Sequence, residues 1–250
     1  GAVGEVALAL VKELELIATG APGSRAAVDC VEALSNMSGS RDRDAHDSAV
    51  NSLTSIAKVA VPQHEDLTRL CLPALCNAGL AYDPFEWNSR LLRQVAETAS
   101  DSMREAVVAE LSGGSLRSAS VHVRTSAVRI LREVALQGQG ALPAQAVSAL
   151  TDVALRDEIS DVAEAAAAAL GDVARRGAHA LPSIEALASQ GLRHEAALVR
   201  MAAVRGLAAA PGPDDVAARC VAALSEGAAD ESEAVALAAC DALLAIGASR

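Results

Sequence analysis

The stretch VRMAAVRGL, residues 199–207, decides the fold of this chain. Its apolar residues Val199, Ala203, Val204 and Leu207 lie at offsets 0, +4, +5 and +8. This spacing places them on one side of an α-helix, because residues three or four apart share a face. The stretch therefore predicts an amphipathic helix that packs its apolar side against neighbours.

The same four-point pattern recurs along the chain. It starts again at Val123, Val162 and Val235, so the steps between successive starts are 39, 37 and 36 residues. A Leu lies 12 residues before several of these starts, as Leu150 does before Val162. Self-similarity at such a period is typical of a helical solenoid. The sequence predicts an all-α fold, an α-α superhelix of about six antiparallel helix pairs plus a leading helix.

Pro and Gly punctuate the expected pairs, as they do at helix ends. We expect one repeat domain over residues 1–250, with a partial repeat over 1–20 followed by helix pairs over 24–61, 64–100, 103–137, 142–176, 181–209 and 213–247. The chain begins with Gly1, and Val6 already fits the pattern, so we expect a piece of a longer or processed protein. In the N-terminal part, first helices fit the template too, so the period leaves open which helix of a pair is the inner one.

Composition narrows the partner classes. Hydrophobic residues make up 52% of the chain and aromatic residues 1%, so Ala and Leu must form the core. The net charge is −11, which argues against a general nucleic-acid or anionic-membrane binder. No apolar run approaches the roughly 20 residues of a membrane span. We expect protein partners, with no nucleic acid and no direct membrane insertion.

Cysteine usage points to a reducing environment. The chain has five Cys and no Cys-x-x-Cys spacing. Most lie at apolar positions of the pattern, so we expect reduced core thiols and a cytoplasmic or other reducing intracellular location. The five are Cys30, Cys71, Cys76, Cys220 and Cys240.

Helix pairs of this length, with Pro near the first helix and Val-Arg opening the second, resemble HEAT repeats. The dipeptides Val123-Arg124 and Val199-Arg200 carry this resemblance best. It implies that the Arg bridges neighbouring repeats. Armadillo repeats are the near alternative, because Leu75-Cys76-Asn77 looks like their inner helix, but the Asn does not recur after Leu131 or Leu170.

Few residues suggest chemistry. His64-Glu65 and His194-Glu195 superficially resemble the iron-holding pairs of the HEAT-like deoxyhypusine hydroxylases, which use four such pairs within the inner helices. Here there are two pairs, and His194 lies five residues before its helix anchor. A Glu in a first helical turn is favoured by the helix dipole. We therefore expect no catalytic residue, no metal and no cofactor.

Offset +6 of each second helix points away from its packed side at about 100° per residue. A basic stripe is predicted there, because four of the seven occupants are Lys or Arg: Lys12, Asn51, Arg93, Arg129, Ala168, Arg205 and Asp241. Arg132 extends the stripe by one turn. Second helices line the concave side of HEAT-like arrays, so the resemblance implies that the stripe docks an acidic segment of a partner. The alternative is a solvated face that pairs with acidic neighbours such as Glu133.

All three aromatic residues lie together around Pro84. Trp87 occupies a core position and is expected to pack. Tyr82 and Phe85 are candidate partner contacts, or alternatively a lid on the core, because aromatic residues are enriched at interface hot spots.

The predicted function is a non-enzymatic scaffold or adaptor that binds another protein along the concave face. The alternative is a structural subunit or spacer of a large assembly. A HEAT-like enzyme or lyase-type protein is a third hypothesis, which the missing ligand spacing disfavours.

Overall fold

The computed structural model describes residues 2–40, 42–61, 63–81, 87–137, 141–176, 179–210 and 214–248. Every regular element in these ranges is helical, which confirms the predicted all-α repeat solenoid. No helix in this part of the chain is both long and apolar enough to span a bilayer. The chain forms two compact units, Gly1–Ala127 and Val128–Arg250. The α7 helix (Val121–Gln137) contains the boundary between them.

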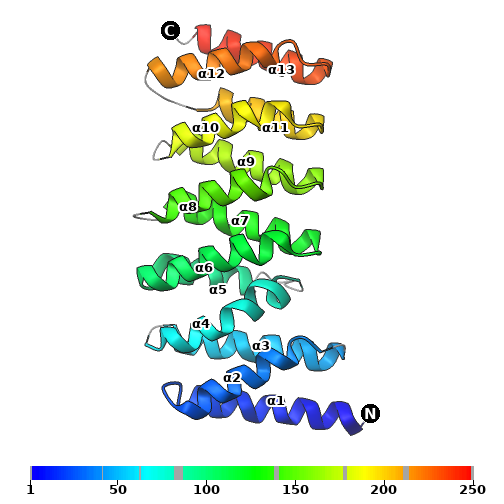
Figure 1. Cartoon of the computed structure of the whole chain (residues 1–250), viewed down its shortest axis with the longest axis vertical. Coiled ribbons are helices and arrows are strands. Elements are labelled where there is room, and N and C mark those ends of the chain that lie inside the picture. Colours follow the sequence, from blue (N-terminus) through cyan, green and yellow to red (C-terminus); the bar gives the residue numbers. More distant parts are fainter. Residues whose placement is uncertain are drawn as a thin grey trace. The chain divides into compact units, whose positions relative to one another are not determined.

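Unit 1 has two layers of helices. First helices α2, α4 and α6 contact one another in sequence, and so do second helices α1, α3 and α5 (Figure 1). The elements are α1 (Ala2–Gly20), α2 (Arg25–Met37), α3 (Arg43–Ala60), α4 (Glu65–Ala74), the π-helix η1 (Leu75–Gly79), α5 (Trp87–Thr98), α6 (Asp101–Gly113), the 3-10 helix η2 (Ser115–Arg117) and the start of α7.

Unit 2 repeats this arrangement. Second helices α9, α11 and α13 pack side by side, and α10 packs against α12 in the first-helix layer (Figure 1). After the rest of α7 come α8 (Leu142–Ala149), the π-helix η3 (Leu150–Ala154), α9 (Ser160–Arg176), α10 (Ala180–Ser189), the 3-10 helix η4 (Gly191–Arg193), α11 (Ala197–Ala208), α12 (Asp214–Gly227) and α13 (Glu233–Ala248).

Residues of the four-point pattern form the core at α9 and α11. Val162, Ala166, Ala167 and Leu170 of α9 have no exposed surface. The matching residues of α11 are at most 1% exposed. Each Å² of apolar surface buried in this way stabilises the fold by about 25 cal/mol. The sequence pattern therefore identified the buried side of these helices.

The four-point pattern predicts burial wrongly for some residues of α1 and α13. Cys240 of α13 is exposed, which also corrects its assignment as a core thiol, and Leu243 is half-buried. Val6 and Leu10 of α1 are exposed as well. Each of these helices packs against neighbours on one flank only, among the described residues, so part of its apolar side lacks a covering helix.

Two first helices contain a π-turn that the sequence did not reveal. We expected continuous helices over 64–80 and 142–156, but the structure widens into η1 and η3. Leu150 and Leu155 are both buried, and the Leu155 amide donates to the Leu150 carbonyl at 2.8 Å. In a regular α-helix residues five apart differ by about 140° in direction, whereas i→i+5 bonding aligns them. The π-turn therefore turns both leucines toward the core. In unit 1, Leu75 and Leu80 on either side of η1 are likewise buried, although the Leu80 amide donates to the Asn77 carbonyl.

Helices α9 and α11 approach each other at two glycines. A Cβ built on Gly171 would lie 2.7 Å from the Gly206 Cα, and one built on Gly206 would lie 2.9 Å from the Gly171 Cα. Real side chains do not tolerate such distances against backbone. The two glycines therefore set the close spacing of these second helices.

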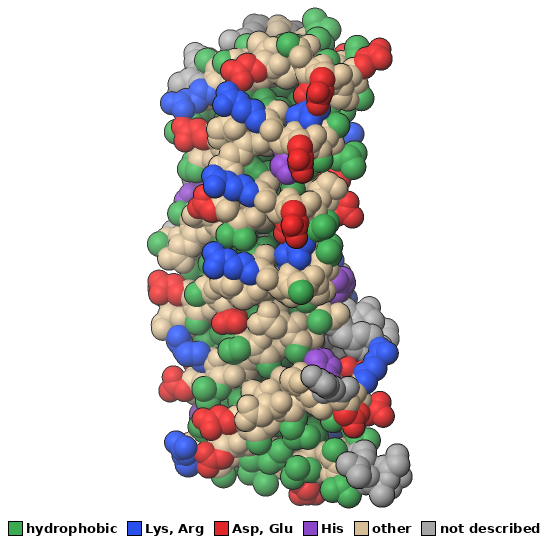
Figure 2. All heavy atoms as spheres, turned by 45° about the vertical axis from the view of Figure 1, so that its right-hand side comes forward, with side chains coloured by type: hydrophobic (Ala, Val, Ile, Leu, Met, Phe, Trp, Pro, Cys, Tyr) green, Lys and Arg blue, Asp and Glu red, His purple; other side chains and the backbone are tan. Residues whose placement is uncertain are grey.

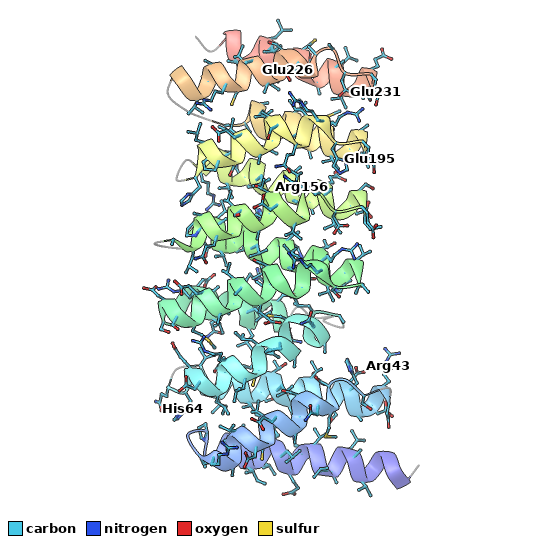
Figure 3. The ribbon with its side chains drawn as sticks, viewed as in Figure 1. Arg43, His64, Arg156, Glu195, Glu226 and Glu231 are labelled. Atoms are coloured by element: carbon cyan, nitrogen blue, oxygen red, sulfur yellow. The ribbon has the colours of Figure 1, made fainter. Side chains whose placement is uncertain are left out.

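A buried arginine links successive repeats of unit 2. The Arg200 Nε and Nη2 donate to the two Asp230 carboxylate oxygens at 2.8 and 3.0 Å. Its Nη1 donates to the carbonyls of His194 and Glu195, and its Nη2 also reaches Glu231. Figure 3 shows Glu195 and Glu231 at the same edge of the unit, near the starts of α11 and α13. Arg200 therefore bridges repeats as the HEAT resemblance implies.

Gly171→Ala is expected to lower the free energy of unfolding of unit 2 by about 1–3 kcal/mol, because the new methyl overpacks against the Gly206 backbone. Helix propensity alone would stabilise the variant by about 1 kcal/mol. Urea denaturation monitored by circular dichroism, with hydrogen exchange in α9 and α11, measures the change. The matched control is Gly247→Ala, where nothing lies within 4 Å. Equal shifts in the same direction for both variants would contradict this account.

Arg200→Ala is expected to destabilise unit 2 by about 3–5 kcal/mol, because it leaves the Asp230 carboxylate buried without its cation. The hydrogen bonds from Arg200, opposed by burial, hold the pKa of Asp230 below its usual value. This stabilisation is present above the unfolded value of about 3.9 and is lost as the pH falls through the lower folded pKa. The difference between wild type and variant should therefore narrow in acid.

Thermal or urea unfolding across pH measures this effect. Arg219→Ala is the control, since the Arg219–Glu185 pair is more than half exposed and such pairs contribute about 0–1 kcal/mol. A loss in Arg219→Ala as large as that in Arg200→Ala would refute the role of burial.

Candidate functional site

The +6 residues of the second helices define a surface that we call the second-helix face. In unit 1, Lys12 and Asn51 are exposed and Arg93 is half-buried. In unit 2, four exposed residues occupy it: Arg129, Ala168, Arg205 and Asp241. All therefore point away from the packed side. Their role in binding stays a prediction.

In unit 1 the predicted cations have local partners. The Lys12 Nζ lies 3.4 Å from the Glu15 Oε2, one turn along α1. The Arg93 Nε donates to the Ser89 carbonyl at 3.3 Å. The candidate contacts Tyr82 and Phe85 lie outside the described residues. Unit 1 therefore offers no built site at this face within the part that the structure describes.

In unit 2 the second-helix face is hollowed between α9 and α11. The groove has a volume of about 230 Å³. Gly171 and Gly206 form its floor, where the two helix backbones touch. Its other lining residues are Glu164, Ala168, Asp172, Arg175, Ala202, Arg205 and Ala209. The sequence period located this face, but it gave no sign of the glycine contact that forms the groove.

A shared carboxylate organises one end of this groove. The Arg132 Nε donates to the Asp172 Oδ2 at 2.6 Å, and the Arg175 Nη2 donates to the Oδ1 at 3.0 Å. Arg132 also pairs with Glu133 at 2.6 Å. Partial burial favours the protonated form of Asp172, but the hydrogen bonds and charges of Arg175 and Arg132 outweigh it and lower its pKa. Arg132 is thus engaged within the protein.

Arg205 differs from these arginines. It projects from the last turn of α11 beside the groove and is exposed. In the ranges that the structure covers, no acidic side chain lies within ion-pair distance of its guanidinium. Arg205 therefore supplies a positive charge at the groove that has no ion-pair partner among the described residues.

A second groove lies between α10 and α12, with a volume of about 360 Å³. Ion pairs cross it, from Arg219 to Glu185 at 2.6 Å and from Arg193 to Glu226 at 3.5 Å (Figure 3 labels Glu226). Sequence analysis missed this groove, although each pair joins residues about one repeat apart. Its cations are already neutralised.

The His and Cys residues have structural surroundings. The His194 Nδ1 accepts from the Ala196 amide at 3.1 Å. Burial raises the pKa of the Cys71 thiol to about 12 and raises that of Cys76 further, so neither is a thiolate at neutral pH. Among the residues described, no three His, Cys, Asp or Glu side chains gather as a metal site needs.

Surface charge is mixed in sign. Figure 2 shows acidic and basic side chains interspersed over the face in view, together with apolar side chains. This face carries no single-sign field of the kind that long-range steering uses.

Comparison with known proteins gives structures but no sequence family. No family model matches the chain, and no curated protein matches it. An archaeal HEAT-like repeats protein from Thermococcus onnurineus NA1 is 13% identical, with 95% of this chain and 97% of that chain covered and a TM-score of 0.48.

Two engineered proteins are also similar. A designed armadillo repeat protein, solved with the peptide (KR)4, is 21% identical, with 85% of this chain and 99% of that one covered and a TM-score of 0.47. Another engineered protein is 23% identical, with 87% and 96% covered and a TM-score of 0.47. The similar structures thus include HEAT-like and armadillo repeat proteins, and the likeness is one of fold.

Arg132→Ala is expected to raise the pKa of Asp172, because the variant removes a hydrogen bond and a positive charge from its carboxylate. A carboxyl-detected NMR titration measures this pKa, which in the wild type should lie below about 3.9. Arg176→Ala, which removes a charge from the last turn of α9, is the control. Equal shifts in both variants would show that the hydrogen bond has no special effect.

Proposed function

We propose that this protein is a non-enzymatic scaffold or adaptor that holds a segment of a partner protein along its second-helix face. The observation that carries the proposal is the α9–α11 groove, which lies on this face beside Arg205. Repeat solenoids offer extended surfaces of this kind. A reducing compartment such as the cytoplasm suits the protein, since Cys71 and Cys76 are buried free thiols.

The size of the groove favours a protein segment over a small molecule. Small-molecule sites typically have volumes of about 300–1,000 Å³ and enclose most of the ligand. The α9–α11 groove is smaller, at about 230 Å³, and is open to solvent. It suits one or two side chains of a segment that continues across the surface.

The charge beside the groove favours an acidic segment. A guanidinium matches a carboxylate in geometry, and Arg205 and Arg129 both project from this face in unit 2. Complementary charge mainly sets orientation and association rate. The proposed partner is therefore a protein segment with Asp or Glu, and no nucleic acid is involved.

A structural subunit of a larger assembly is the second candidate. The observation that favours it is the exposed apolar surface of two helices. Val6, Leu10 and Ile17 of α1 are between 47% and 69% exposed. Leu237 and Leu244 of α13 are 58% and 72% exposed. Apolar surface of this kind marks association sites when it is contiguous.

Display of a random peptide library against the whole chain tests the scaffold proposal. Peptides rich in Asp or Glu are expected, and they should bind Arg205→Glu at least tenfold more weakly, about 1.4 kcal/mol. Arg156→Glu is the matched control, because Arg156 is exposed and binds Gln190 in the first-helix layer (Figure 3). Failure to select any peptide would refute the proposal. Selection of peptides that bind only through α1 or α13 would favour the second candidate.

A further inference from the structure

We propose that the α9–α11 groove is a recognition slot for a single carboxylate side chain, with Arg205 as the cation that binds it. The slot is the part of the groove over Ala168. This inference rests on the proposed function and names the chemistry that unit 2 recognises. Four steps support it.

The first step is the position of Arg205. Gly206, the next residue, touches Gly171 of α9, so this contact brings Arg205 close to α9. Helical side chains lean toward the N-terminus of their helix. Arg205 therefore leans toward Ala168, which lies three residues before Gly171, a rise of about 4.5 Å.

The second step is the open space at Ala168. Its neighbours on the stripe, Arg129 of α7 and Arg205 of α11, are long and cationic, whereas Ala168 is small and exposed. A side chain entering from solvent thus meets a methyl group below. The volume of about 230 Å³ accepts such a side chain.

The third step is the choice among the arginines of the groove. Asp172 already accepts hydrogen bonds from Arg132 and Arg175, so part of their charge is neutralised. Arg205 has no such partner in the part of the chain that the structure covers. A carboxylate from a partner would therefore gain most at Arg205, through a charge-assisted hydrogen bond.

The fourth step is the acidic end of the groove. Glu164 lies one turn before Ala168 on α9, about 6 Å along the axis. It repels a second carboxylate placed there. The slot therefore accepts one acidic residue and disfavours another one turn away, which gives the bound segment a direction.

Fluorescence polarisation with a labelled Ala-rich peptide that carries a single Glu, called the Glu-Ala peptide, tests the slot in the full chain. Arg205→Gln is expected to weaken binding about tenfold, and Arg156→Gln is expected to leave it unchanged. Ala168→Leu, which fills the slot from an exposed helix position, is expected to weaken binding similarly. Its control is Ala222→Leu in the α10–α12 groove, which should bind as wild type does. Glu164→Gln should strengthen binding a few-fold.

Each variant is expected to fold, because all the changed residues lie at the surface or are half-buried. Circular dichroism checks this. Binding that survives both Arg205→Gln and Ala168→Leu would overturn the slot. Equal binding of a Lys-Ala peptide would also overturn it. If library peptides bind while the Glu-Ala peptide does not, the slot is refuted and the scaffold function stands. If neither binds, both proposals fail.

Discussion

The structure depends on how closely its second helices can pack. With almost no aromatic side chains, the core must gain its stability from many small contacts, and dispersion falls steeply when a gap opens. Ala fills the interface positions of α9 and α11, and Gly171 and Gly206 remove the last side chains where the backbones meet. The groove on the second-helix face follows from the same contact, because two helices without side chains at their closest point leave a hollow above it. Packing and the candidate site are thus two results of one constraint.

Charge contributes to the fold in proportion to its burial. Arg200 and Asp230 are each less than a tenth exposed and satisfy one another with two hydrogen bonds. Pairs in the first-helix layer are solvated and contribute little individually. Among these ties, Arg69 to Ser102 and Arg156 to Gln190 join residues 33 and 34 apart. The buried pair therefore links the last two repeats of unit 2, and the exposed contacts between first helices add little to this order.

Most helices could be predicted from the sequence because an amphipathic repeat records which side is buried. Val162 and Val199 were located in this way, and so was the exposed side that carries Arg205. The pattern fails where burial depends on a neighbour rather than on the residue itself, as at Cys240 and Val6. The π-turn after Leu150 was missed because the helix period assumes a constant twist. The Asp172 network and the α9–α11 groove were missed because both depend on distances between helices, which an anchor spacing does not contain.

The contrast between the two layers of unit 2 has a mechanical consequence. On one side, backbone touches backbone at Gly171 and Gly206, which leaves no slack for compression. On the other side of the same boundary, the long and exposed side chain of Arg156, just after η3, donates to Gln190 at the end of α10, and it can lengthen its reach by changing rotamers. A force that bends the unit therefore pivots about the glycine contact and opens the first-helix layer. We therefore expect unit 2 to bend more easily by opening its first-helix layer than by compressing its second-helix layer.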